Sequence, residues 1–484
     1  MEQIADAILG VADWITLHIT IWVLLGTGLY LTWRTRAVQV RLFGHMVRVV
    51  LGSRDGGDGG ISSFQAFTIS LAARVGIGNV FGVAAALLLG GPGAIFWMWI
   101  VALIGMATAF FEATLAQLFK VRGPDGTFRG GPAYYMSIGM RSRTMGAVFA
   151  IITVITCAFV ITTVQSNAVA QVMQGSANTT PGITAALLFA FAAPVIMGGI
   201  RSVARVTEIM APIMATVYVI LAAVIVLLNI GQFPHVMSMI VSSAFSPEPV
   251  VGGLGGGILA AIINGTKRGL FSNEAGQGTA PNAAATATVR HPVRQGLIQS
   301  LGVFVDTVIV CTATGFIILI AGEKVWTSPE ANPATLTTMA VADALGQWAV
   351  VPMAVMIFVL AFSSIIAAYV YSEVNMHFVT QAPAGRWVVR VVSVASVVIG
   401  ALVSLDVVWN TVDIAMAIMT ITNLVALIFL AKWGVGALRD YEAQRRAGES
   451  DPQFSAVENP HLPGPLNTDV WHDSVQPHNG KDCR

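Results

Sequence analysis

Two glycine-rich, polar stretches interrupt apolar segments of this chain and are the clearest places for a small ligand to bind. The first is AARVGIGN at Ala72–Asn79, and the second is NGTKRGLFSNEAGQG at Asn264–Gly278. Where glycines break a helix inside a membrane, backbone N–H and C=O groups are freed and must find partners, line a cavity or bind a ligand. Freed N–H groups suit a carboxylate, and freed carbonyls suit an ammonium group or a hard cation.

The elements that must position these stretches are membrane-spanning helices. Of the 484 residues, 55% are hydrophobic and only 11% are charged, and the mean hydropathy of +0.74 excludes a water-soluble globular fold. Long apolar runs recur without the alternation of a β-barrel, so we predict an all-α polytopic membrane protein embedded in the lipid bilayer. About 11 transmembrane helices are expected, at 14–33, 64–89, 93–119, 145–173, 181–200, 206–229, 252–288, 297–321, 349–373, 387–405 and 408–431.

The basic residues predict the orientation of the chain. Nearly all of the 26 Lys and Arg residues fall in alternate predicted loops and in the tail after Leu430. By the positive-inside rule that face is cytoplasmic. In a bacterial inner membrane, the N-terminus is therefore expected outside the cell and the C-terminus in the cytoplasm. Arg74, Lys267 and Arg268 instead lie within predicted spans, where we expect acidic partners, with Glu274 favoured for Lys267 or Arg268. Candidate acids, which could alternatively carry protons, are Glu112, Glu208, Glu274, Asp306, Glu373 and Asp413.

The spacing of the two breaks predicts the domain organisation. They fall in the second and seventh predicted spans and so open two groups of five helices, and an odd number of helices per group requires the second group to be inverted. We predict a peripheral N-terminal helix and loop at 1–63, a first repeat at 64–230 and an inverted repeat at 251–432. The polar, Pro-rich tail at 433–484 is expected to be cytoplasmic and largely disordered.

Several other functional classes lack their characteristic residues. There is no Walker-type phosphate loop, the three cysteines have no paired spacing and the histidines are scattered, so we expect neither an enzyme nor an organic cofactor. The net charge of +1 gives no indication of nucleic-acid binding. A channel is less favoured because polarity concentrates at two breaks instead of along a continuous pore-lining face. The breaks also have a plainer interpretation, as sites of close helix packing and interhelical hydrogen bonds.

Three further stretches resemble signatures of the alanine or glycine:cation symporter family. They are GGPGAIFWMWIVALIGM at Gly90–Met106, GGPAYYM at Gly130–Met136 and FSNEAGQGTAPNAAATA at Phe271–Ala287. With VGIGNV at Val75–Val80 and the order of spans, the similarity covers about residues 14–440. The resemblance implies a leucine-transporter-like fold and a secondary active symporter, in which sodium, less often protons, drives uptake of alanine or glycine by alternating access. A downhill facilitator or channel is the alternative, and the oligomeric state stays open.

The same resemblance implies the residues of the site. The first break would hold the substrate carboxylate, and the expected substrate-binding residues are Ile77, Gly78, Gln165, Phe271, Ser272, Asn273 and Ala368. Sodium, the transported coupling ion, would bind Ala73, Gly76, Ser363 and Ser364, with a second ion position near Asn79. Plainer roles are an interhelical hydrogen bond for Gln165 and bonding back to their own helix for the two serines.

Two positions depart from the family pattern. Family members often carry Thr and Trp where this chain has Ile77 and Ala368. The change removes a hydroxyl and a bulky wall, so we expect a side-chain pocket larger than one built only for glycine or alanine.

Overall fold

The computed structural model describes residues 10–11, 14–53, 61–123, 126–247, 257–403 and 405–472, and these are almost entirely helical. Helices suit the apolar sequence because each one satisfies its own backbone hydrogen bonds where water is absent. Within the described residues the extended structure amounts to one short hairpin, in which β1 (Val121–Arg122) pairs antiparallel with β2 (Phe128–Arg129), and one isolated bridge.

The helices follow one another with short connections. The first half contains α2 (Ile21–Arg34), α3 (Val38–Arg41), α4 (Phe43–Leu51), α5 (Ser63–Arg74), α6 (Val83–Gly90), α7 (Gly93–Leu118), α8 (Pro132–Tyr134), α9 (Arg143–Ile155), α10 (Thr162–Ala177), α11 (Pro181–Met197), α12 (Gly199–Leu228) and α13 (Phe233–Ser243). The second half contains α14 (Ile258–Asn273), α15 (Ala280–Ala285), α16 (Pro292–Val303), α17 (Thr312–Ala321), α18 (Glu323–Trp326), α19 (Leu336–Leu345), α20 (Val350–Val379), α21 (Pro383–Leu402) and α22 (Leu405–Arg446). π-Helical segments lie at Thr16–Thr20, Gly78–Gly82, Tyr135–Gly139, Thr156–Ile161 and Phe304–Cys311.

The described part of the chain has eight helical stretches long and apolar enough to cross a membrane. A ninth results if α5 and the helix Gly78–Gly90, bent by 44° at their break, form one span. The predicted spans at 181–200 and 252–288 correspond to α11, which has only 17 residues, and to α14 and α15, which a non-helical segment separates. The predicted all-α membrane fold is confirmed, whereas the count of about eleven spans is not.

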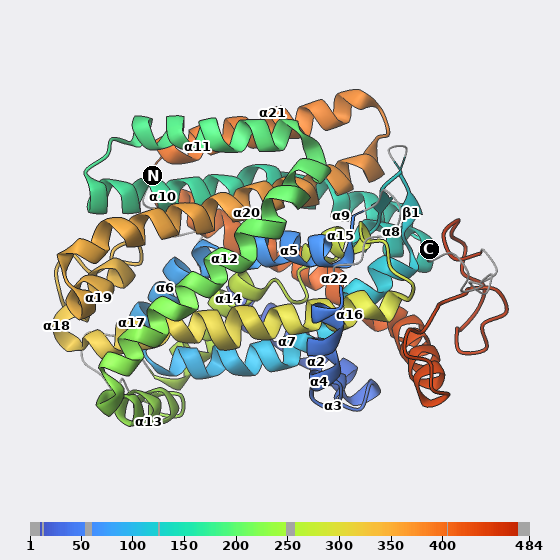
Figure 1. The fold of residues 1–484 in the computed structure, drawn as a ribbon, viewed down its shortest axis with the longest axis horizontal. Helices are drawn as coiled ribbons and strands as arrows, with labels where there is room; N and C mark the ends of the chain where they lie inside the picture. Colours follow the sequence, from blue (N-terminus) through green and yellow to red (C-terminus); the bar gives the residue numbers. More distant parts are fainter. Residues whose placement is uncertain are drawn as a thin grey trace, which may run out of the picture.

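The two broken helices lie in the interior, surrounded by long helices (Figure 1). α14 packs against α7 and α6, while α5 packs against α12 and α20. In Figure 1, α7 and α16 run side by side below them, and α11 and α21 run side by side at the top. Large apolar side chains such as Trp22, Ile209 and Phe429 are exposed on outer helices, as expected for contact with lipid.

Each predicted repeat contains a series of helices. The first predicted repeat, 64–230, contains α5 to α12, and the second, 251–432, contains α14 to α21 and most of α22. The start of the second group lies at 251–256, outside the described residues. Their inverted relationship stays a prediction.

The tail differs from the predicted disorder. α22 continues to Arg446, and the chain after it packs back onto the ends of the helices, with Phe454 and Trp471 buried. The Trp471 indole N–H donates to the Gln117 carbonyl at 3.0 Å, and the Phe454 N–H donates to the Arg290 carbonyl at 2.9 Å. The average composition of the tail predicted disorder because an average does not show the effect of a few buried apolar residues such as Phe454 and Trp471. Residues 473–484, the rest of the predicted tail, lie outside the described residues.

Trp471→Ala should release this tail. Trp471 packs edge-on against Phe454, and the Lys120 ammonium lies 4.9 Å from its ring centre. Truncating a buried tryptophan costs about 3 kcal/mol or more, so local opening of 447–472 should increase roughly a hundred-fold. Amide hydrogen exchange of that segment measures the change. Val457→Ala, at an exposed position of the same tail, is the control, and equal protection in both variants would contradict an anchoring role.

Candidate functional site

The first break occurs where α5 approaches α20. α5 begins with a capping box, in which Ser62 Oγ accepts from the Gln65 N–H at 3.1 Å and Gln65 Oε1 accepts from the Ser62 N–H at 3.0 Å. It ends at Arg74, and the chain resumes as a π-helical segment at Gly78. A Cβ atom on Gly76 would lie 2.0 Å from Ser364 Oγ, so only glycine allows this close approach.

Four oxygen atoms from α20 and α5 gather at this break. Ser364 Oγ donates to the carbonyls of Ala72 and Ala73 at 3.1 and 3.0 Å, and Ser363 Oγ donates to Ala72 at 2.9 Å. Both hydroxyls also bond back to the Leu360 carbonyl, at 2.7 and 3.3 Å, which is the plainer role expected of these serines, and their role as sodium ligands stays a prediction. A set of hydroxyl and carbonyl oxygens is the kind that a hard cation prefers.

The carbonyls that the two serines contact differ in part from the carbonyls expected as sodium ligands, those of Ala73 and Gly76. The Gly76 carbonyl accepts the Asn79 N–H at 3.2 Å and thus serves its own turn of helix. The Ala72 carbonyl takes both serine hydroxyls, and sequence reasoning missed it. The position of the break could have indicated Ala72, because a helix that ends at Arg74 leaves its last four carbonyls without partners in the helix.

A second polar cluster joins the two breaks. Asn79 Nδ2 donates to Ser272 Oγ at 3.0 Å and to Asp306 Oδ1 at 2.6 Å, and Ser272 Oγ donates to Asp306 Oδ2 at 2.6 Å. Asn79 Oδ1 accepts the Gly76 N–H at 2.8 Å, and Thr307 Oγ1 donates to Asp306 at 2.8 Å. The polar side chains of this cluster are all buried: Asn79, Ser272, Asp306 and Thr307. Asp306 was predicted only as an intramembrane acid, and its place between the breaks could not be inferred from spacing.

The second break is stabilised by an acid from α7. After α14 ends, Gly276 and Gly278 adopt left-handed φ values of +90° and +80°, which favour glycine. Their N–H groups donate to the two Glu112 carboxylate oxygens at 3.0 and 2.8 Å, and Asn423 Nδ2 donates to the same carboxylate at 2.6 Å. Glu112 thus satisfies backbone donors that the broken helix leaves exposed. From the sequence, Glu112 was predicted only as a candidate intramembrane acid.

A small pocket lies between the breaks. It is lined by Ala73, Ile161, Gln165, Phe271, Glu274, Gln277, Ser364, Ala368, Tyr371 and Met416. Five expected residues are therefore together at its wall: Ala73, Gln165, Phe271, Ser364 and Ala368. The pocket has room for about one water molecule, so its walls must separate before an amino acid can enter.

The other expected residues lie outside the pocket wall. Gln165 Oε1 accepts the Ile77 N–H at 3.4 Å, which brings α10 against the first break. A Cβ atom on Gly78 would lie 3.0 Å from the Phe271 ring, so the two breaks are in direct contact there. Ser272 belongs to the Asp306 cluster, and Asn273 Oδ1 accepts the Ala275 N–H at 2.9 Å.

The cations inside the spans have other partners than the one favoured. Lys267 Nζ and Arg268 Nη2 lie 3.8 and 3.2 Å from Asp413 Oδ2, whereas Glu274 accepts a hydrogen bond from the Tyr371 hydroxyl at 3.1 Å. Asp413, from α22, therefore lies against both cations, and the preference for Glu274 was wrong.

Arg74 is also buried, with 1% of its surface exposed. Its Nη1 donates to the Gln299 carbonyl at 3.2 Å, and its Nε and Nη2 have no hydrogen-bond partner among the described residues. No acid within ion-pair distance of it was found in that part of the chain, so the predicted pairing of Arg74 is not observed.

The family model for sodium:alanine symporters matches residues 1–456. This chain belongs to that family. The amino-acid carrier protein AlsT of Bacillus subtilis is 41% identical over 476 residues, which cover 98% of this chain and 100% of the relative. The sodium/alanine symporter AgcS of Methanococcus maripaludis is 37% identical over 417 residues, 84% of this chain and 90% of the relative. Membership makes this protein a membrane-embedded, sodium-coupled amino-acid transporter and not an enzyme.

Solved structures show the fold of the family. MhsT in complex with L-phenylalanine matches with a TM-score of 0.57 at 14% identity, over 76% of this chain and 89% of that one. A Na⁺-coupled sialic acid symporter in an outward-open state matches with a TM-score of 0.53 at 13% identity, over 91% and 93%. The predicted leucine-transporter-like fold is therefore confirmed.

Glu112→Gln should loosen the second break. The amide keeps one acceptor but turns an N–H₂ group toward a backbone donor, which costs about 2 kcal/mol or more. Amide exchange at 274–279 should accelerate roughly thirty-fold, and transport should fall with it. Glu373→Gln, the same change at a buried acid bonded by Tyr369 on α20, is the control. Unchanged exchange at 274–279 in Glu112→Gln would rule out this capping role.

Proposed function

We propose that this protein couples the influx of sodium to the uptake of a small neutral amino acid, alanine or glycine, by alternating access. The observation that carries the proposal is the position of Ser364. Its hydroxyl contacts the carbonyls of Ala72 and Ala73 and also lines the pocket that contains Ala368 and Gln165. A cation held by these oxygens would thus lie directly beside the substrate.

The first break supplies the groups that a zwitterion needs. The substrate carboxylate binds at the backbone of Ile77 and Gly78, where the π-helical segment begins and its first N–H groups lack partners within the helix. Gln165 accepts from one of these N–H groups at 3.4 Å, and the substrate carboxylate displaces it. The ammonium group is met by oxygens of the second break, near Phe271 and Asn273.

Coupling follows because ion and substrate share one segment. Sodium draws the Ala72 and Ala73 carbonyls toward Ser363 and Ser364, and the same segment continues within four residues into the carboxylate site at Ile77. Each ligand stabilises the geometry that the other requires, which is the condition for positive coupling between two sites. Neutral oxygen ligands favour sodium over a proton at this position.

A second ion position near Asn79 rests on the Asp306 cluster. The Asp306 carboxylate accepts from Asn79, Ser272 and Thr307 and is fully buried. A carboxylate surrounded by neutral donors binds either a sodium ion or a proton, so this position is where the two coupling ions would compete.

The protein lies in a bacterial inner membrane. Its N-terminus is on the outer side of that membrane, and its C-terminal tail is in the cytoplasm. Support comes from the gathering of basic residues at one end of the molecule, where Arg34 and Arg41 of the N-terminal segment line a pocket with Arg439 and Arg446 of α22. Such clusters favour the cytoplasmic face.

A larger neutral amino acid such as glutamine is the second candidate substrate. Glu274, Gln277 and Tyr371 line the pocket beside Ala368, and these polar groups suit a polar side chain. One relative, 40% identical over 485 residues, is a probable sodium/glutamine symporter of Bacillus subtilis.

Uptake of labelled alanine into proteoliposomes tests the proposed function. An inward sodium gradient should drive accumulation above the external concentration, and collapse of that gradient should release it. Accumulation with a proton gradient alone would replace sodium by protons, and equilibration without accumulation would establish a downhill facilitator instead.

Ser364→Ala should weaken the apparent affinity for sodium by roughly ten-fold, because one ligand of a charged group is removed. The order of preference among amino acids should not change. Ser372→Ala is a matched control on the same helix, since the buried Ser372 hydroxyl donates to the Ala368 carbonyl at 3.0 Å and lies outside the pocket lining. Equal sodium affinity in the two variants would show that Ser364 is not a ligand.

Ala368→Trp should restrict the pocket to small substrates. A pocket wall discriminates one methylene by about 1–3 kcal/mol, so the preference for alanine over a larger amino acid should rise ten-fold or more. Competition of labelled alanine uptake by glycine, serine, glutamine and leucine measures the effect. Ala368→Val, a smaller change, should lie between the two. Identical rank orders in all three active proteins would place Ala368 outside the substrate pocket.

A further inference from the structure

A pocket rich in arginine lies at the end of the first span, away from the transport site. The cavity has a volume of about 340 Å³. We name it the arginine pocket after the five arginines in its lining, Arg34, Arg36, Arg41, Arg439 and Arg446. One acid, Glu442, completes its charged lining.

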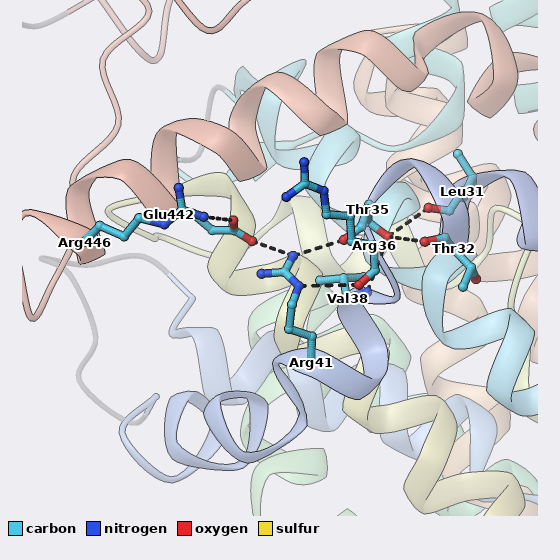
Figure 2. Close-up of polar contacts among 8 residues, drawn as sticks. All are labelled: Leu31, Thr32, Thr35, Arg36, Val38, Arg41, Glu442 and Arg446. Atoms are coloured by element: carbon cyan, nitrogen blue, oxygen red, sulfur yellow. Dashed lines mark hydrogen bonds and ion pairs between the residues drawn. The ribbon is translucent and has the colours of Figure 1, made fainter.

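Segments from the two ends of the chain form this pocket. Arg34 ends α2 and Arg41 ends α3, while Arg439, Glu442 and Arg446 repeat along one face of α22 at helical spacing. Figure 2 shows Arg41 reaching from the N-terminal segment to Glu442, beside Arg446.

The turn between α2 and α3 holds Arg36 in an unusual conformation. Arg36 and Ala37 both have φ of +55°, a left-handed backbone that costs free energy for residues other than glycine. The turn is held by hydrogen bonds from the Arg36 N–H to the Trp33 carbonyl at 3.1 Å and from the Ala37 N–H to the Thr32 carbonyl at 2.7 Å. Arg36 is part of the cavity lining, and Figure 2 shows its side chain extending from this turn.

The charges in the pocket are not balanced by the protein. Glu442 is shared, with one oxygen 2.7 Å from Arg41 Nη2 and the other 3.2 Å from Arg446 Nη2. Arg34 donates to the Tyr30 hydroxyl at 2.6 Å. Arg36 and Arg439 make no side-chain hydrogen bond or ion pair in the described part of the chain. Guanidinium groups gathered around one carboxylate repel one another unless an anion is present.

The positive field extends beyond the cavity. His45 lies on α4 and its ring contacts the Tyr441 hydroxyl at 2.9 Å. Burial, followed by the charges of Arg445, Arg48 and Arg294, lowers the pKa of His45 to about 4. The three arginines thus add to the effect of burial and further disfavour a positive charge on His45.

The position of the pocket selects the kind of anion. Arg34 is the last residue of the span Thr16–Arg34, and Trp22, Leu29 and Trp33 of that span expose 67%, 55% and 74% of their surface. The candidate span within α22, Val412–Arg446, has 35 residues, more than the ~30 Å hydrocarbon core requires at ~1.5 Å per residue. The pocket thus lies where apolar, lipid-facing surface gives way to the headgroup region.

We propose that the arginine pocket binds the phosphate group of an anionic phospholipid. The planar guanidinium group matches phosphate oxygens in a bidentate manner, and basic pockets beside transmembrane helices are suited to lipid headgroups. A membrane lipid is favoured over free phosphate because its acyl chains can lie along the exposed apolar surface of α2, next to Trp33. The proposal is independent of the identity of the transported substrate.

The test measures thermal stability of the purified full chain in detergent with added lipid. Phosphatidylglycerol should raise the melting temperature more than phosphatidylcholine, and native mass spectrometry should retain at least one phosphatidylglycerol molecule. In R36Q/R439Q, the apparent affinity for phosphatidylglycerol should fall about ten-fold or more, because both guanidinium groups without protein partners are lost. These side chains are exposed, so the variant should fold.

Two further arms distinguish the alternatives. R143Q/R205Q removes the same charge at exposed positions outside the pocket lining and should bind the lipid like the wild type. Equal losses in both double variants, or no preference for phosphatidylglycerol, would overturn the proposal. Inorganic phosphate should not reproduce the stabilisation, and if it does so at millimolar concentration, the pocket binds a soluble anion and not a lipid.

Discussion

Helices that break inside a membrane need partners for their backbone polar groups, and the rest of this structure follows from that constraint. No water is present in the hydrocarbon region to satisfy a freed N–H or C=O group, and each one costs several kcal/mol if left alone. The donors of the second break are satisfied by Glu112 of α7, and the carbonyls of the first break by Ser363 and Ser364 of α20. The positions of α7 and α20 beside the breaks therefore depend on these hydrogen bonds as well as on apolar packing.

The two breaks also constrain each other. Asn79, in the first break, and Ser272, in the second break, both donate hydrogen bonds to the Asp306 carboxylate. The two breaks also lie in contact at Gly78 and Phe271. The two breaks are therefore joined by short, buried hydrogen bonds, which are strong where the dielectric constant is low. Under the proposed function, substrate and ion would act on one connected polar unit, which is the physical requirement for coupling.

The sequence predicts the class of fold and the location of the breaks because both depend on local composition. Apolar runs define spans, and glycine with polar neighbours defines where a helix ends. The partners of buried charges are not local: Arg268 and Asp413 are 145 residues apart, and the choice between Asp413 and Glu274 depends on how each helix is rotated. The ordered tail was missed for a related reason, since its packing rests on individual side chains, Phe454 and Trp471, within a polar segment.

Family membership and pocket chemistry give different information about the substrate. The breaks carry the groups for a carboxylate and an ammonium, which all amino acids share, so they explain the class of substrate and not the member. In the proposed site, selection among amino acids would depend on the opposite wall, where the small Ala368 lies beside the polar Glu274, Gln277 and Tyr371. An alanine methyl group would leave those polar groups without a substrate partner. A side chain with a terminal amide would offer these groups a further partner, although in the structure Tyr371 already bonds Glu274 and Gln277 bonds the Leu270 carbonyl. A pocket that bonds a polar substrate group discriminates strongly against a substrate that lacks it. Under the proposed function, substrate preference thus depends on Ala368 and Tyr371 of α20 and on the residues that follow α14, which are not among the expected ion ligands.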